Sequence, residues 1–252
     1  DINELGGLAS LISKIPAKNR LADFPHYLMH RAEQLDNLYI FKNTEGTPEN
    51  IRKFHPNIIV SSTGSAPLLP PIAGLKDRID NEDYNIYSIL GMISHINDFP
   101  KDLEGKKVVV VGGGAVGLDV VEFFADRNAD ISIVEMMDQI GRDLDPVSKN
   151  DTKTMMKKHN VHQLTKTALL EVKDSSFLVR GDGEPYELPF EYGFVCLGMR
   201  AQGQLYQNLT EEFSSEDVEI MNIGDSQRAR RIIDGTQEGR NILTILEQKG
   251  YL

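Results

Sequence analysis

The clearest pattern in the chain is an apolar run that leads into glycines and then into a helical repeat. Residues 108–111 are all valine, which is typical of a parallel strand buried on both faces. A helix is predicted over residues 117–128, and a second β-branched strand over residues 131–134. This order predicts a βαβ unit.

The same periodicity predicts the other elements. Residues 47–50 begin a short helix, with Thr47 as its N-cap and Pro48 at its first position. Further helices are expected over residues 23–35, 86–96, 146–159 and 230–248. Strands are expected over residues 38–41, 58–60, 161–164, 169–172, 177–179, 194–197 and 218–223. The pattern predicts an α/β fold whose parallel sheet is accompanied by a small antiparallel sheet.

The composition of the chain argues against several classes of function. The net charge of −11 argues against nucleic acid as a partner, because phosphate binding needs clustered lysine and arginine. The single cysteine, Cys196, rules out disulfides, iron–sulfur ligation and a redox pair within this chain, so we expect a cytoplasmic protein. Cys196 lies in a predicted strand, so we expect its thiol to be buried. No apolar run is long enough to cross a membrane. Because the chain begins with Asp1, we expect a processed product or a fragment.

The glycines after residue 111 form the clearest ligand-binding motif in the chain. Gly112, Gly114 and Gly117 occupy the G-x-G-x-x-G positions, with Gly113, Ala115 and Val116 between them. They provide a tight turn, room for a pyrophosphate and close helix–strand packing, and the helix start offers free N–H groups to the phosphates. A glycine-rich turn without a ligand is the structural alternative, but the flanking strands and helix favour NAD binding.

Glu135 ends the second strand, 23 residues after Gly112, where a ribose ligand is expected. A carboxylate there accepts hydrogen bonds from ribose hydroxyls and repels a 2′-phosphate, so we predict NADH over NADPH. Arg142, seven residues later, is an alternative phosphate ligand.

Two further segments flank the glycine loop: residues 58–65, with Thr63-Gly64 after a strand, and residues 220–225, which end in Gly224-Asp225. Together they resemble the flavoprotein reductases with two dinucleotide domains. More narrowly, residues 5–7, 61–67, 107–122 and 223–234 resemble the C-terminal portion of the 2,4-dienoyl-CoA reductase and 2-enoate reductase family, which is old yellow enzyme-like.

The resemblance implies a division of the chain. An NAD(H) domain over residues 100–215 would be inserted into a truncated, three-layer FAD-type domain formed by residues 1–80 and 216–252, with residues 81–99 as a connector. Asp225 would bind the flavin's ribityl chain, Thr63, Gly64 and Gly224 would line the FAD site, Glu122 would contact nicotinamide, and Gly198 would belong to the cofactor site.

The resemblance also implies a reaction. NADH would pass a hydride to FAD, and the electrons would continue to an N-terminal barrel with FMN and a 4Fe–4S cluster. The first FAD-binding glycine loop of the family lies before residue 5 of this pattern, so FAD binding is expected to be weak or absent. No catalytic acid or base is assigned.

Several alternatives stay open. As alternatives to cofactor binding, Asp225 would cap the next helix, Thr63-Gly64 would form an ordinary turn, and Glu122 would be an ordinary helix residue. His26 and His30 have metal-ligand spacing but are interpreted as a surface pair. The arginines within residues 228–231 form either an anion site or a solvated helix start. The rival functions are a pyridine nucleotide–disulfide reductase, disfavoured because there is no cysteine pair, and a non-enzymatic dinucleotide-binding or partner-docking module.

Overall fold

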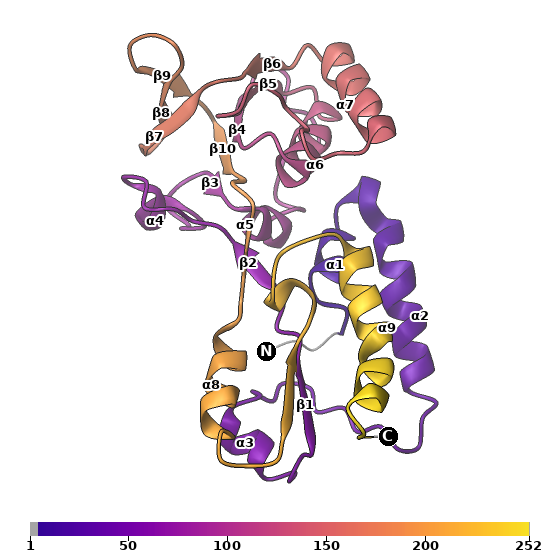
Figure 1. Cartoon of the computed structure of the whole chain (residues 1–252). Coiled ribbons are helices and arrows are strands. Elements are labelled where there is room, and N and C mark those ends of the chain that lie inside the picture. The colour runs from indigo at the N-terminus through magenta and orange to yellow at the C-terminus, as the bar shows by residue number, and fades with distance from the viewer. Residues whose placement is uncertain (1–4, 252) are drawn as a thin grey trace. The chain divides into compact units, whose positions relative to one another are not determined.

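The computed structural model describes residues 5–251, which form two compact units (Figure 1). Unit 1 comprises residues 5–13, 20–66 and 199–251, and unit 2 comprises residues 14–19 and 67–198. Two elements are divided between the units: η1 (Pro16–Ala22) and β2 (Ser65–Pro67). In the described part of the chain, no helix combines the length and the apolar character required to span a bilayer.

Unit 2 contains two sheets. Its five-stranded parallel sheet has the order β3 (Ile86–Tyr87), β10 (Tyr192–Val195), β4 (Lys107–Val111), β5 (Asp130–Val134) and β6 (His162–Leu164). Its antiparallel sheet consists of β7 (Ala168–Val172), β8 (Ser176–Arg180) and β9 (Tyr186–Pro189). The helices are α4 (Leu75–Arg78), α5 (Ile89–Ser94), α6 (Ala115–Ala125) and α7 (Pro146–Lys158). This confirms the expected α/β fold with a parallel and a small antiparallel sheet.

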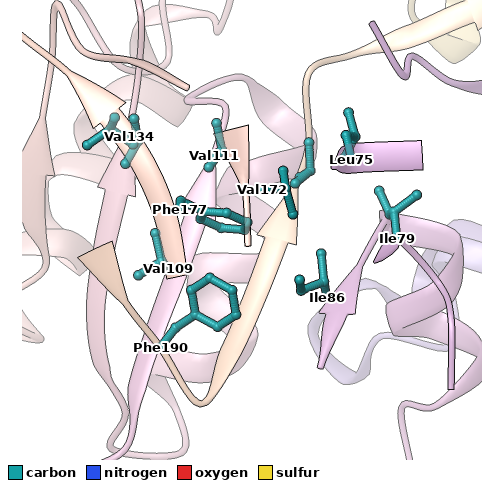
Figure 2. Close-up of a cluster of buried hydrophobic side chains, with 11 residues drawn as sticks. Leu75, Ile79, Ile86, Val109, Val111, Val134, Val172, Phe177 and Phe190 are labelled. Atoms are coloured by element: carbon teal, nitrogen blue, oxygen red, sulfur yellow. The ribbon is translucent and has the colours of Figure 1, made fainter. Parts of the chain in front are cut away.

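The core of unit 2 explains why β4 is apolar at four successive positions. Val109 and Val111 belong to a buried cluster that includes Phe177 from the antiparallel sheet and Phe190, as Figure 2 shows. Val110 lies on the other face, where it approaches Gly117 of α6. Because both faces of β4 are covered, polar side chains have no place after Lys107.

An aromatic cluster covers the helical face of the parallel sheet. The ring centroids of Phe124 on α6 and Phe194 on β10 are 4.8 Å apart, and Phe99 meets Phe124 edge-on at 5.1 Å. These contacts fix α6 over the centre of the sheet, so the start of α6 lies where β4 ends.

Unit 1 is built around a short parallel pair. Strands β1 (Ile58–Ser61) and β12 (Glu219–Asn222) pair with Ile59 opposite Ile220. Ile59 is buried with Leu209 and Phe213 beside it. The other elements of unit 1 are α1 (Gly7–Ile12), α2 (Asp23–Ala32), α3 (Pro48–Arg52), β11 (Met199–Ala201), α8 (Gln204–Glu212), η2 (Gly224–Ser226) and α9 (Ile232–Gln248). Figure 1 shows α2 and α9 side by side, and their residues line a common apolar groove.

Local signals predicted several of these elements correctly. Thr47 caps α3 by accepting a hydrogen bond from the Asn50 N–H at 3.2 Å, as expected. Residues 38–41, in contrast, form no strand, and this prediction was wrong. They lack a neighbouring strand, and Tyr39 is 78% exposed, so their β-forming side chains have no sheet to join.

The unit boundaries differ from the expected segments because of packing. Residues 67–80 belong to unit 2, since Leu75 and Ile79 fill its core. The expected connector contributes β3 to the parallel sheet before α5 begins, so only the latter part of residues 86–96 is helical. Residues 199–215 belong to unit 1, where α8 supplies the buried Leu209.

Replacing Phe177 with alanine tests the two-sheet core. Phe177 is fully buried, with its ring centroid 4.5 Å from that of Phe190. We expect Phe177→Ala to lower the free energy of unfolding of unit 2 by about 3–5 kcal/mol, because it leaves a cavity between the sheets. Urea denaturation followed by circular dichroism measures this. Tyr186→Ala, on the exposed side of β9, is the control and should change stability by less than about 0.5 kcal/mol; equal losses would contradict the assigned core.

Candidate functional site

The turn between β4 and α6 depends on two glycines. Gly112 has a φ of 110°. A Cβ built there would lie 2.1 Å from the carbonyl oxygen of Cys196, which directly follows β10. A Cβ at Gly117 would lie 1.9 Å from the Gly112 carbonyl oxygen. Side chains at either position would therefore collide with backbone. These glycines are required by the fold of the loop itself.

Gly114 is different, because nothing in the fold requires its lack of a side chain. Its φ is −80°, it is exposed, and an added Cβ would meet no atom within 4 Å. It precedes the first residue of α6, whose opening N–H groups have no acceptor inside the helix. Open space next to these N–H groups and the positive end of the helix dipole suits an anion.

Glu135 is held against the glycine loop. Its Oε2 accepts a hydrogen bond from the Gly113 N–H at 2.7 Å, and its Oε1 accepts one from the Met137 N–H at 2.7 Å. The side chain is half-buried, and each oxygen keeps a lone pair for a further donor. The carboxylate is thus positioned beside the loop by backbone groups and can accept hydroxyl hydrogen bonds.

Gly198 lies at the same edge of the sheet. The Cys196 N–H donates to the Val111 carbonyl at 2.7 Å, which places the end of β10 beside the end of β4. Gly198 follows with a φ of 104°, and no atom lies within 4 Å of an added Cβ. The carboxyl ends of neighbouring parallel strands thus bring together the glycine loop, Glu135 and Gly198, where ligands of open α/β sheets bind.

Glu122 lies farther along α6, in an ion cluster that the sequence did not reveal. The Lys18 Nζ is 3.1 Å from a Glu122 carboxylate oxygen and 3.0 Å from one of Asp119. Burial raises the pKa of Asp119, although the Lys18 charge counteracts this shift. Burial lowers the pKa of Lys18, but the two carboxylates outweigh that effect and leave it raised. The i,i+3 spacing of Asp119 and Glu122 was a usable signal for a shared helix face; Lys18 gave none.

The predicted residues of unit 1 make contacts of their own. The Thr63 hydroxyl donates to the Gln202 carbonyl at 2.5 Å, and the Gln202 N–H donates to the Gly64 carbonyl at 3.0 Å. Gly64 has a φ of 74°, as a turn requires. The Gly224 N–H donates to the Glu238 carboxylate at 2.6 Å.

Asp225 is held by two donors. The Ser65 hydroxyl donates to its Oδ2 at 3.1 Å, and the Arg230 N–H donates to its Oδ1 at 3.0 Å. Asp225 does not cap α9, because the Asp234 carboxylate accepts from the N–H of the capping residue, Arg231. The capping alternative for Asp225 is therefore not observed, while lone pairs remain on its oxygens for a ligand.

The arginines within residues 228–231 and the His26/His30 pair, the weaker site candidates, include side chains that contact other residues of this chain. Arg230 is 2.5 Å from the Glu238 carboxylate, and Arg231 is 3.6 Å from that of Asp234. His30 lies 3.3 Å from the Gln34 amide. Across residues 5–251, the structure contains no cluster of three or more histidine, cysteine or acidic side chains arranged to hold a metal ion.

Comparison with known proteins identifies the family. The model of the family described as "pyridine nucleotide-disulphide oxidoreductase" matches residues 30–221, which is more than half of the chain. The chain belongs to this family.

Relatives of this family member include reductases and oxidases of greater length. A metal reductase of Desulforamulus reducens is 25% identical over 95% of this chain and 38% of its own length. An NADH oxidase of Thermoanaerobacter brockii is 24% identical over 93% of this chain and 35% of its own length. The chain therefore spans little more than a third of these relatives.

A solved structure shows the same fold. A 2-naphthoyl-CoA reductase superposes with a TM-score of 0.77 at 22% identity, covering 94% of this chain and 34% of the reductase. At 22% sequence identity, this structural similarity establishes the fold alone.

The family name and the cysteine count concern different properties. The chain belongs to the family described as pyridine nucleotide-disulphide oxidoreductase, and the lack of a cysteine pair still disfavours disulfide reduction within this chain. The cysteine count bears only on disulfide chemistry within this chain. Burial, with smaller contributions from the Asp119 and Asp80 carboxylates, raises the pKa of the Cys196 thiol to about 12.

Cys196 should therefore be unreactive in the folded protein. Because the thiolate is the reactive form, we expect labelling by a thiol reagent at about pH 8 to be roughly a hundredfold slower in native protein than in guanidinium chloride. Absorbance of the released thiolate measures the rate, and Cys196→Ser provides the blank. Rapid labelling of the native chain would contradict this description of the thiol.

Proposed function

We propose that the chain binds NAD(H) at the loop of residues 112–117 and serves a flavin-dependent NADH oxidoreductase. The observation that carries this proposal is the open space at Gly114 beside the unpaired N–H groups of α6, next to the Glu135 carboxylate. The N–H groups would hold the pyrophosphate, and Glu135 would accept hydrogen bonds from the adenosine ribose. Family membership supports the proposal.

The cofactor would supply the chemistry and the chain would supply positioning. Bound NADH donates a hydride from its nicotinamide ring. Ala115, Val116 and Gly117 would orient the phosphates, and Gly198 would leave room at the neighbouring strand end. The described residues are assigned no proton transfer.

FAD is the proposed hydride acceptor. Asp225 fits such a role, because it is fixed by Ser65 and by the Arg230 N–H and still has lone pairs for ribityl hydroxyls. Thr63, Gly64 and Gly224 would lie along the same cofactor.

The finer assignment is an enoate or dienoyl-CoA reductase-like enzyme. In that proposal an N-terminal barrel, with FMN and a 4Fe–4S cluster, receives the electrons from FAD. The lengths of the relatives leave room for such a domain, and two of them are named as reductases of a metal and of bilirubin.

Gly114→Ala tests the NAD(H) site. The methyl group should be tolerated by the fold, because it meets no neighbouring atom, but it would occupy the space that a phosphate needs. We expect NADH to bind at least about tenfold more weakly in isothermal titration calorimetry, with thermal stability unchanged. Gly183→Ala, another position with open space, is the matched control. Unaltered NADH affinity in Gly114→Ala would refute the proposed phosphate position.

Glu135 should set the choice of cofactor. Its carboxylate would repel a 2′-phosphate, so the chain should bind NADH more tightly than NADPH. In Glu135→Gln the charge is lost, and we expect the preference for NADH to fall by about tenfold. Dissociation constants for both cofactors measure this, with Asp138→Asn in the neighbouring loop as the control. Tighter binding of NADPH to the unaltered chain would defeat the assignment.

A further inference from the structure

A cavity lies directly beside the start of α6. It has a volume of about 410 Å³ and lies between α6 and α7. Ala115, the first residue of α6, lines it together with Leu118, Leu144 and Met155. This volume is within the range of small-molecule sites. A molecule whose phosphates bound at the helix start would therefore have the cavity within reach.

One ammonium group controls the charge of this cavity. Among the described residues that line it, Lys18 alone is positive, whereas Asp119, Glu122 and Asp151 are negative. The Lys18 Nζ lies 3.0 Å from an Asp119 carboxylate oxygen and 3.1 Å from one of Glu122, so the ammonium is ion-paired with both carboxylates. Asp119 is four residues after Ala115, which is about 6 Å along the helix axis.

The position of Glu135 indicates which half of a dinucleotide approaches the cavity. Glu135 is fixed to Gly113 and Met137, on the flank of the loop that follows β5, and would hold the adenosine half. The cavity contains Asp119 and Glu122, which Glu135 does not contact. With the pyrophosphate at the start of α6 and the adenosine half at Glu135, the cavity would receive the nicotinamide half.

We infer that Lys18 shifts the binding preference of this site from NAD⁺ toward NADH; this inference rests on the proposed NAD(H) function. The oxidised nicotinamide ring is positive and the reduced ring is neutral. Asp119 and Glu122 would attract a positive ring, but Lys18 already neutralises part of their charge and repels another cation. Lys18 therefore weakens binding of NAD⁺ and leaves binding of NADH largely unchanged, which favours release of the oxidised cofactor.

Binding measurements on the whole chain test this role without any turnover. Dissociation constants for NAD⁺, NADH and ADP-ribose are compared in the unaltered chain, Lys18→Met, Lys18→Arg and Lys14→Met. In Lys18→Met we expect the affinity for NAD⁺ relative to NADH to rise about fivefold, because the carboxylates lose their partner. Lys18→Arg keeps the charge and should restore the ratio. Lys14→Met, an exposed lysine of the same segment, should leave the ratio unchanged.

ADP-ribose, which lacks nicotinamide, separates the two proposals. Absence of ADP-ribose binding to the unaltered chain would overturn the dinucleotide site itself. Normal ADP-ribose binding with an unchanged NAD⁺ to NADH ratio in Lys18→Met would overturn only the role of Lys18. A parallel loss of affinity for all three ligands would also overturn it, because that is the mark of a structural defect. The ratio change should shrink as salt is raised, which supports a charge effect.

Discussion

The site depends on the close approach of three backbone segments at the end of β4. Gly112 lies against the Cys196 carbonyl, and Gly117 lies against the Gly112 carbonyl. These contacts leave no room for a Cβ, and they force the chain to turn directly from strand to helix. The first N–H groups of α6 have no acceptor inside the helix, and the turn places them directly after β4. Close packing within the loop thus positions these free donors at the end of the strand.

The glycines of the loop therefore serve different purposes, which a motif alone does not distinguish. Gly112 and Gly117 are needed whether or not a ligand binds, since the fold itself excludes side chains there. Gly114 has no such constraint, and its small size has a physical use only if something approaches the helix start. The argument for a ligand rests on Gly114 and on Glu135 beside it, rather than on the number of glycines.

Sequence reasoning succeeded where the determinants were local. The valines of β4, the turn of glycines and the end of β5 lie within 30 residues of each other, so their pattern predicted both the βαβ unit and the position of Glu135. It failed where the determinant was a distant partner. Residues 38–41 have β-forming side chains but no strand to pair with, and Lys18 meets Asp119 only because residues 14–19 fold into unit 2.

The two sides of the loop are consequently built by different means. Glu135 is oriented by neighbouring backbone N–H groups, so its geometry is determined as soon as the βαβ unit forms. Asp119 and Glu122 are oriented by one side chain from a remote segment, and burial of Asp119 makes that partner necessary. A change in residues 14–19 would alter the charge beside the helix start without disturbing the phosphate loop. The fold can thus retain dinucleotide binding while the charge next to the cofactor varies independently.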